Sequence, residues 1–190
     1  MAADKENIPA IIELSYIFTN GVTNYMKPNI DLAFHYIRKG FKRSYEETIV
    51  CLDPIIEKGN ENEKKEAEKL YKEAIEKGSV IAMNNYAVVL YKQKRNEEAE
   101  KYFKLAIDKG CVEAMNGYAF LKIKEDSQSA KDEAVFYFKK AIENGCETAM
   151  QNYSVISKDV KIIQYEKLQH TQLFSLSNTS LTIYIIVLVC

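Results

Sequence analysis

The chain has 190 residues, 47% of them hydrophobic, and a formal net charge of −1, so it is long enough for one domain or one short repeat array. The near-neutral charge excludes a strongly basic nucleic-acid binder, and the hydrophobic content excludes an acidic disordered tail. Because the chain has only two His and four Cys, it offers little material for a metal site, and we expect no metal and no cofactor.

The N-terminal sequence predicts a protein that is not exported. Acidic residues precede the first apolar residues, whereas a signal peptide begins with basic residues and continues with a clean apolar stretch. We therefore expect a cytoplasmic location. We also expect reduced thiols at the four cysteines, Cys51, Cys111, Cys146 and Cys190.

Apolar residues recur at i, i+3, i+4 and i+7 or i+8 along most of the chain, which is the period of an amphipathic helix and not of a strand. We predict helices at about 8–20, 30–43, 46–58, 62–77, 80–93, 96–109, 112–124, 130–144 and 147–157. Asp53-Pro54 lies inside the third of these, so that helix should kink or begin late. Asn96 and Ser129 lie where helix N-caps are expected.

The most informative feature of the sequence is an internal repeat. Three stretches beginning at Ala67, Ala99 and Ala134, which are 32 and 35 residues apart, align without gaps over more than twenty positions. A weaker copy begins at Ala33. Still earlier, Ala10 and Leu14-Ser15-Tyr16 match the columns of Ala82 and Tyr86-Ala87-Val88. The aligned columns are Ala74, Ala106 and Ala141; Tyr71, Phe103 and Phe138; Tyr86, Tyr118 and Tyr153; Gly78, Gly110 and Gly145; and Ala82-Met83, Ala114-Met115 and Ala149-Met150.

Each repeat unit is a pair of helices whose apolar faces are buried only when neighbouring pairs stack. Gly at the end of each second helix suits a left-handed C-terminal cap, and the alanine column allows close approach of paired helices. We therefore predict an all-α fold, a short right-handed solenoid of antiparallel helix pairs. Its predicted parts are an extension at 1–7, an array of about four units at 8–157, and a diverged capping helix with an uncharged apolar tail at 158–190.

The pattern resembles the Sel-one-like repeat, a relative of the tetratricopeptide repeat. Ala10, Leu14-Ser15-Tyr16 and Gly21 match the first half of the family pattern, and the stretch from Ala99 to Gly110 matches the second half. The resemblance covers about residues 8–157. Some positions depart from the Sel-one-like pattern, which blurs the boundary with the tetratricopeptide family. The resemblance implies a protein–protein scaffold or adaptor in a solenoid fold without catalytic activity.

Two columns beside the core predict a binding site on the first helices, which in related solenoids line a concave groove. Amides recur at Asn84, Asn116 and Gln151, and apolar residues follow four positions later at Val88, Phe120 and Val155. The four-residue spacing places each pair on one helix face. Amides can bond the backbone of an extended peptide, while apolar side chains supply contact area. The alternative is that these amides only bond between units.

Three functions compete at this point. The leading hypothesis is a non-catalytic adaptor that binds a protein or peptide partner in the groove, and no nucleic acid. The second is a membrane-tethered adaptor of a protein quality-control complex, in which the uncharged residues 171–190 would be the anchor. Two other interpretations of these residues are that they cap the array or that they are an artefact of the predicted terminus. The third is a thiol-dependent hydrolase, which the lack of a Cys–His pairing in register disfavours. His35 has the pattern of a partly exposed helix residue.

Overall fold

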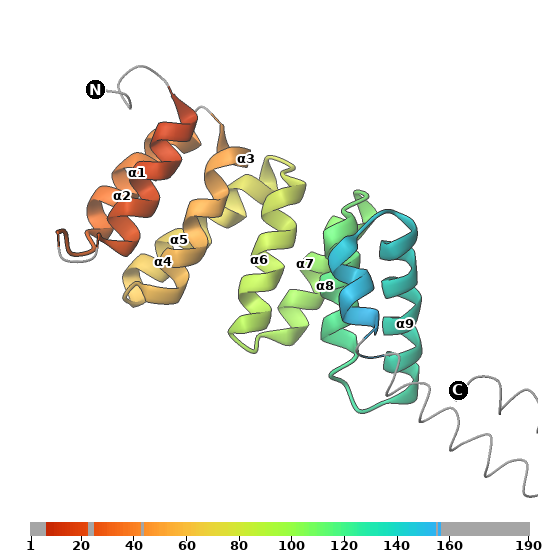
Figure 1. Cartoon of the computed structure of the whole chain (residues 1–190). Helices are drawn as coiled ribbons and strands as arrows, with labels where there is room; N and C mark the ends of the chain where they lie inside the picture. The colour runs from red at the N-terminus through yellow and green to blue at the C-terminus, as the bar shows by residue number, and fades with distance from the viewer. Residues whose placement is uncertain (1–6, 23–24, 43, 155, 157–190) are drawn as a thin grey trace, which may run out of the picture. The chain divides into compact units, whose positions relative to one another are not determined.

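Helices account for nearly all the regular structure in the residues that the computed structural model describes, which are 7–22, 25–42, 44–154 and 156 (Figure 1). An isolated bridge joins Val22 to Met26 between the first two helices. The chain divides into two units, Met1–Ala149 and Met150–Cys190. The first unit contains every helix discussed below, and the described part of the second consists of helical residues 150–154 and residue 156.

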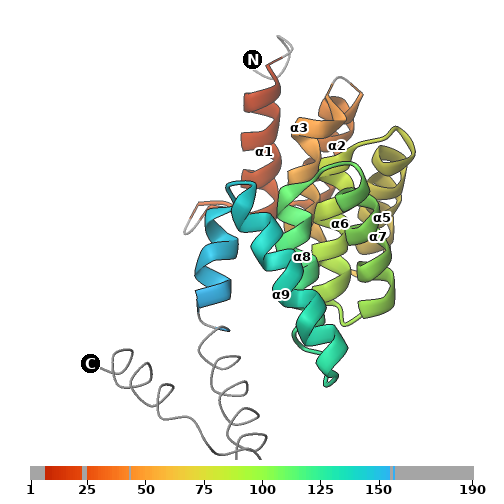
Figure 2. The same cartoon turned by 90° about the vertical axis from the view of Figure 1, so that its right-hand side faces the viewer.

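The helices of the first unit follow one another as antiparallel pairs that lie roughly side by side (Figures 1 and 2). Their bounds are α1 Ile8–Asn20, α2 Ile30–Phe41, α3 Tyr45–Thr48, the 3-10 helix η2 Ile49–Leu52, α4 Asp53–Lys58, α5 Glu61–Glu76, α6 Val80–Lys92, α7 Asn96–Asp108, α8 Val112–Lys122 and α9 Gln128–Glu143. Another helix begins at residue 147. These ends agree with the predicted helices to within two residues, so the all-α solenoid is confirmed.

The helix predicted at 46–58 is broken, as the proline suggested. Pro54 has no N–H to donate to a preceding carbonyl, so a continuous α-helix cannot pass through it without losing a hydrogen bond. The chain forms α3, tightens into η2, and begins α4 at Asp53, with Pro54 in the first turn. The 3-10 segment ends before Pro54, which therefore lies in the first turn of α4, where its missing N–H breaks no intrahelical bond.

The small-residue columns are buried as predicted. Ala74, Ala106 and Ala141 are all fully buried, as are Ala67, Ala99 and Ala134. The aromatic column that separates them, Tyr71, Phe103 and Phe138, is at most 1% exposed. Alanine at these positions lets helices approach, and the aromatic rings fill the space beside them.

Three of the second helices end in the same hydrogen-bonded cap. After α7, the N–H of Cys111 donates to the carbonyl of Ala106 at 3.0 Å and the N–H of Gly110 donates to Ile107 at 2.8 Å. Gly110 has a φ of +84°, a left-handed conformation that glycine adopts at no steric cost. The same pair of bonds follows α5 and α9, which confirms the predicted role of Gly78 and Gly145.

Both predicted N-caps are wrong. Helix α7 begins at Asn96 itself, and its N-cap position is Arg95, whose side chain caps no backbone N–H. Helix α9 begins earlier than predicted, and the hydroxyl of Ser127, not of Ser129, accepts the N–H of Ala130 at 3.1 Å. Pattern alone does not fix the residue at which a helix begins, and the backbone path decides which residue lies at the N-cap position.

The predictions for residues 159–170 and 171–190 lie outside the described residues. In the part of the chain that is described, no helix is long and apolar enough to cross a membrane.

Candidate peptide-binding face

The repeat columns define one surface on the first helix of each pair, which we call the first-helix face. Each first helix contributes positions i, i+3 and i+7, which share one side of a helix. The face consists of Pro9, Ile12 and Tyr16 on α1; Glu47, Val50 and Pro54 on α3 to α4; Ile81, Asn84 and Val88 on α6; and Glu113, Asn116 and Phe120 on α8.

Side-chain contacts join the consecutive first helices near their C-terminal ends. Lys58 of α4 donates to the amide oxygen of Asn20 at the end of α1. Further along, Lys92 of α6 pairs with Glu57 of α4 at 2.6 Å. These contacts show that the first helices are neighbours, so the face is a single surface across four units.

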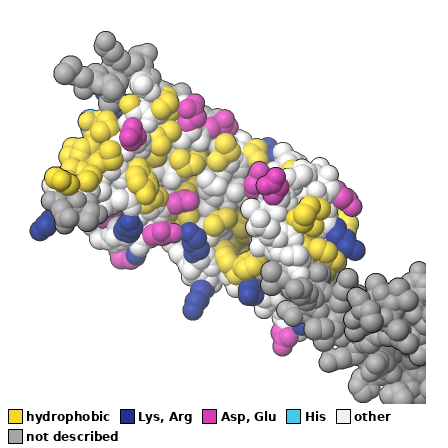
Figure 3. All heavy atoms as spheres, in the orientation of Figure 1, with side chains coloured by type: hydrophobic (Ala, Val, Ile, Leu, Met, Phe, Trp, Pro, Cys, Tyr) yellow, Lys and Arg dark blue, Asp and Glu magenta, His cyan; other side chains and the backbone are white. Residues whose placement is uncertain are grey.

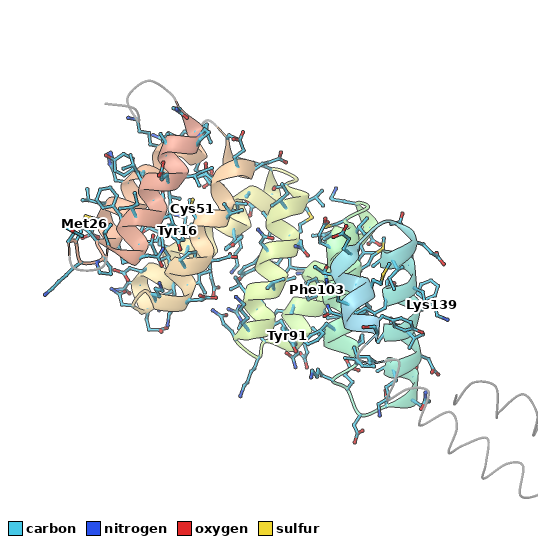
Figure 4. All side chains as sticks on the ribbon, viewed as in Figure 1. Tyr16, Met26, Cys51, Tyr91, Phe103 and Lys139 are labelled. Atoms are coloured by element: carbon cyan, nitrogen blue, oxygen red, sulfur yellow. The ribbon has the colours of Figure 1, made fainter. Side chains whose placement is uncertain are left out.

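An aromatic pair makes the last of these junctions. The rings of Tyr91 and Phe120 meet edge to face with centroids 6.1 Å apart, and the ammonium of Lys124 lies 5.2 Å from the Phe120 centroid. Figure 4 labels Tyr91 on α6 and Tyr16 on α1. Phe120 is still partly exposed beside these two neighbours.

The predicted amides of the first unit lie on this face and are partly exposed. Asn84 donates from its amide nitrogen to the side-chain oxygen of Asn85 at 3.2 Å, while its own oxygen is buried without a hydrogen-bond partner. Asn116 lies at the same position of α8. The bond between Asn84 and Asn85 stays within one helix and therefore does not join the units.

The apolar partners of these amides contribute to packing as well as to the surface. Val88 is half-buried and packs on the hydrophobic core. Gln151 is exposed and belongs to the second unit, and Val155 lies outside the described residues. Asn84 and Val88 on α6 and Asn116 and Phe120 on α8 are thus partly exposed at matching positions of two first helices.

Sequence reasoning missed the most exposed apolar residues of the face. Tyr16 is 62% exposed, Val50 47% and Ile81 45%. Figure 3 shows hydrophobic side chains gathered over α1 and continuing in patches toward α6. The signal was available: in the two weaker copies of the repeat, Ile12 and Val50 occupy the column of Asn84, and Tyr16 occupies the column of Val88.

The neighbouring tyrosine column belongs to the core. Tyr86 and Tyr118 are fully buried, and their hydroxyls donate to Glu68 at 3.0 Å and to Glu133 at 2.8 Å. Burial, assisted by these carboxylates, raises the pKa of both phenols above the ordinary value. The phenols therefore remain neutral donors, which tie the first helices to the second helices on either side.

Cations complete these carboxylate contacts between units. Arg95 donates to Glu68 at 2.7 Å, and Lys122 donates to Glu100 at 2.9 Å. Lys122 is only 8% exposed and its ammonium lies 5.7 Å from the Tyr118 ring centroid. Because each buried polar group has a partner, this network stabilises the stacking without offering a binding site.

The three cysteines that the structure describes, and His35, lie in separate surroundings. Burial raises the pKa of the Cys51 thiol to about 11, so it stays protonated at neutral pH. Cys111 and Cys146 are half-buried, not buried as small core residues would be, and their sulfurs contact Glu113 and Thr148. His35 is exposed and packs edge to face on Tyr36. No cluster of three metal-ligating residues occurs among the described residues.

Comparison with known proteins identifies the repeat. The Sel1 repeat model matches residues 8–45, 57–79 and 112–146, together just over half of the chain. The chain belongs to the Sel1 repeat family. A tetratricopeptide repeat model matches residues 80–111 of this Sel1 repeat protein, so one unit of the tetratricopeptide type lies between Sel1 units. No curated protein sequence matches the chain significantly.

The matched ranges agree with the helix pairs of the Sel1 array. Residues 8–45 hold α1 and α2, residues 80–111 hold α6 and α7, and residues 112–146 hold α8 and α9. The match at 57–79 covers α5 without its first helix, which is the one that Pro54 breaks. The family pattern therefore fails at the place where the helix geometry departs from it.

A solved structure has the same fold. It is c5321, a protective antigen present in uropathogenic Escherichia coli strains and described as displaying an SLR fold. The similarity has a TM-score of 0.57 with 18% sequence identity, and it covers 88% of the Sel1 repeat protein and 38% of that chain. The chain thus spans well under half of the length of this structural relative.

Proposed function

We propose that the protein is a non-catalytic adaptor that binds a protein or peptide segment on the first-helix face. Sel1 and tetratricopeptide repeats generally mediate protein–protein interaction. The observation that carries the proposal for this chain is the position of Asn84, Val88, Asn116 and Phe120, which are partly exposed on two neighbouring first helices beside a fully buried core.

These side chains have the chemistry that a bound segment needs. An amide nitrogen carries two donor hydrogens, and at Asn84, whose oxygen is buried, a bound main chain would be recognised through its C=O groups. The ring of Phe120 supplies apolar area next to these amides, and aromatic residues near the centre of an interface carry much of its binding energy. The raised pKa of the Cys51 thiol gives no support to a nucleophilic function.

The test uses a partner isolated by affinity capture and then purified. The variant Asn116→Ala with Phe120→Ala is expected to weaken binding of that partner by about 2 kcal/mol or more, which is about 30-fold, because it removes an amide and a central aromatic contact. Calorimetric titration measures the change. The control is Phe136→Ala, which removes an aromatic side chain that is 58% exposed on the second helix α9.

Thermal unfolding of the same variants separates a surface role from a core role. The variant at positions 116 and 120 should unfold at a much higher temperature than Tyr118→Ala. If it loses as much stability as Tyr118→Ala, these residues are core and the proposed site is wrong. Normal partner binding by a stably folded variant would place the interface elsewhere.

A further inference from the structure

Helix α2 and its C-cap residue carry a row of basic side chains that the other second helices do not share. The row occupies positions i, i+3, i+4 and i+7, which lie on one side of a helix. We call it the basic stripe, and it consists of His35, Arg38, Lys39 and Lys42. The equivalent four columns include Glu73 and Glu76 on α5, Asp108 on α7 and Glu143 on α9. Among the four second helices, α2 alone has no acidic residue in these columns.

The side chains of the basic stripe line an open hollow on the surface of α2. Arg38 and Lys42 are exposed there, and Lys39 is half-buried. From His35 to Lys42 the chain rises about 10 Å, because each helical residue adds about 1.5 Å. Several positive charges within this short distance concentrate a positive potential, which attracts an anion.

Glu66 on the neighbouring helix α5 offsets part of this charge. The Nε and Nη2 atoms of Arg38 both donate to one oxygen of Glu66, the first at 3.0 Å. Arg38 thus uses two of its five N–H donors on this carboxylate. The stripe carries three permanent positive charges, and Glu66 offsets one of them. The one acidic residue of α2 itself, Asp31, lies in the first turn, far from Lys42 along the helix.

The positive charge does not continue from α2 along the array. The ion pair of Arg38 with Glu66 makes α5 a neighbour of α2, and α5 has Glu73 and Glu76 in the same columns. A nucleic-acid backbone requires a positive groove that contacts many phosphates, and a membrane surface requires a larger cluster of Lys and Arg. A short stripe is instead suited to one compact anionic group.

A phosphate monoester matches the donors of the stripe better than a carboxylate does. A phosphorylated side chain has about 1.5–2 negative charges at neutral pH and three acceptor oxygens. The guanidinium of Arg38 and the ammonium of Lys42 can donate to different oxygens of one phosphate while Arg38 keeps its bond to Glu66. A carboxylate brings one charge and only two oxygens to the same donors.

We infer that the basic stripe of α2 binds a phosphoserine of a protein segment, with the phosphate held by Arg38 and Lys42 and bordered by His35 and Lys39. The inference goes beyond the proposed function, because none of these residues lies on the first-helix face. It adds a second contact, on a second helix, that depends on phosphorylation of the bound protein.

NMR titration of the isotope-labelled full chain tests the inference with three ten-residue peptides. All three consist of Gly, Ala and Ser residues, and they carry phosphoserine, glutamate or serine at the same central position. The phosphoserine peptide is expected to bind at least 10-fold more tightly than the other two and to shift the backbone signals of α2. Equal binding of the three peptides overturns the inference, and so does a phosphoserine peptide that shifts only signals of other helices.

A matched pair of variants separates the stripe from overall charge. Arg38→Gln with Lys42→Gln should weaken the phosphoserine peptide at least 10-fold. The control, Lys139→Gln with Lys140→Gln, removes two exposed cations from α9, where Figure 4 labels Lys139, and should change the affinity less than 2-fold. Both variants lower the net charge by two. If the control weakens binding as much, the peptide responds to net charge alone and the site is wrong.

Glu66→Gln is expected to change the affinity in the opposite direction. The substitution removes a negative charge beside the phosphate and releases Arg38, so the phosphoserine peptide should bind about 5-fold more tightly. The side chains of Arg38 and Glu66 are 53% and 39% exposed, and such a surface pair contributes little to stability, so the melting temperature should stay nearly constant. Unchanged or weaker binding by this variant would overturn the placement of the phosphate at Arg38.

Further measurements distinguish other anionic occupants and the proposed function. If vesicles with anionic lipid or single-stranded RNA bind the stripe more tightly than the phosphoserine peptide does, and the Arg38/Lys42 variant abolishes this binding, the phosphoserine occupant is wrong. The Asn116/Phe120 variant should bind the peptide normally, because it changes no residue of the stripe. Loss of peptide binding by that variant would contradict a separate site, whereas a partner that ignores Asn116 and Phe120 would overturn only the proposed function.

Discussion

The first two helix pairs, α1 to α5, and the next two, α6 to α9, share a core and differ on the surface. In all four pairs the second helix buries an alanine followed four positions later by a large residue: Ala33 and Ile37, Ala67 and Tyr71, Ala99 and Phe103, Ala134 and Phe138. On the first-helix face, however, Ile12 and Val50 stand where Asn84 and Asn116 stand later. Stacking therefore constrains the core columns, while the face can change from unit to unit.

The ends of the second helices differ in the same way. Helices α5, α7 and α9 end at a left-handed glycine, but Ser44 occupies this column after α2. The N–H of Ser44 continues the helical pattern by donating to Gly40 at 2.8 Å, and its carbonyl accepts the hydroxyl of Thr48 at 2.7 Å. Helix α3 begins at the next residue, Tyr45, and the broken first helix follows.

The largest expected loss of stability concerns the repeat column of Tyr118 and Leu52 in the first helices. It tests whether the two halves of the array use this column in the same way. Tyr118→Ala should cost about 3–5 kcal/mol of unfolding free energy, because it empties a fully buried site and removes the donor to Glu133. Leu52 fills the same column in the broken helix, and Leu52→Ala should cost about 2–5 kcal/mol. Urea unfolding measures both, and a cost below 1 kcal/mol for Leu52→Ala would break the equivalence.

The small-residue column of the second helices gives the next effect. Ala106→Leu should overpack a fully buried contact and cost about 1–3 kcal/mol. Gly40 holds the same column in α2, where an added Cβ would lie 2.7 Å from the Thr48 hydroxyl and 2.9 Å from an Ile11 methyl carbon. Gly40→Ala should therefore destabilise, although alanine favours a helix by about 1 kcal/mol.

Thermal unfolding checks these two variants against Asp108→Leu, which changes an exposed residue of α7. The control should stay within about 0.5 kcal/mol of the parent. A Gly40→Ala protein that is more stable than the parent would show that the first pair packs less tightly than the others.

Two substitutions at helix caps are expected to change the free energy of unfolding by similar amounts in opposite directions. Gly110→Ala places a side chain at a φ of +84°, where an added Cβ meets no atom within 4 Å, so only backbone strain of about 1 kcal/mol opposes it. Lys94 has a φ of +62° after α6, and Lys94→Gly should stabilise by up to about 1 kcal/mol. The denaturant midpoint should fall for Gly110→Ala and rise for Lys94→Gly. A destabilised Lys94→Gly variant would show that Lys94 does not adopt the left-handed conformation at the end of α6.

The smallest effect concerns Asp53, beside the break in the first helix. Burial raises its pKa above the ordinary value, and the Tyr71 hydroxyl and the Lys92 charge offset this only in part. A raised carboxyl pKa gives stability that is present below the unfolded-state pKa and is lost as pH rises through the folded-state pKa. The ionised group is therefore unfavourable at pH 7.

Asp53→Asn keeps an acceptor for Tyr71 and removes this cost. The melting temperature of the variant should exceed that of the parent at pH 7, and the difference should vanish near pH 3, where both side chains are neutral. A lower melting temperature of the variant at pH 7 would show that the carboxylate is stabilising. Glu100, whose burial is outweighed by Lys104 and Lys122, has a lowered pKa and should show the opposite pH trend.

The sequence by itself determined the helices, the repeat columns and the glycine caps. These depend on residues close in the chain, because a helix bonds each residue to the one four positions away and repeats its burial every 3.6 residues. Pro54 predicted the broken helix for the same reason, because a proline removes a hydrogen bond to a residue only four positions away. The two N-cap predictions failed because the first residue of each helix lies one to two positions from where the pattern placed it.

Only the tertiary structure decided which side chains of those helices remain accessible. Val88 and Tyr16 share a column, but Val88 packs on the core while Tyr16 stays largely exposed. Glu68 likewise bonds Tyr86 and Arg95, which lie 18 and 27 residues away, and no local pattern selects those partners. Exposure and ion pairing depend on the helices stacked beside a residue, and these come from distant parts of the chain.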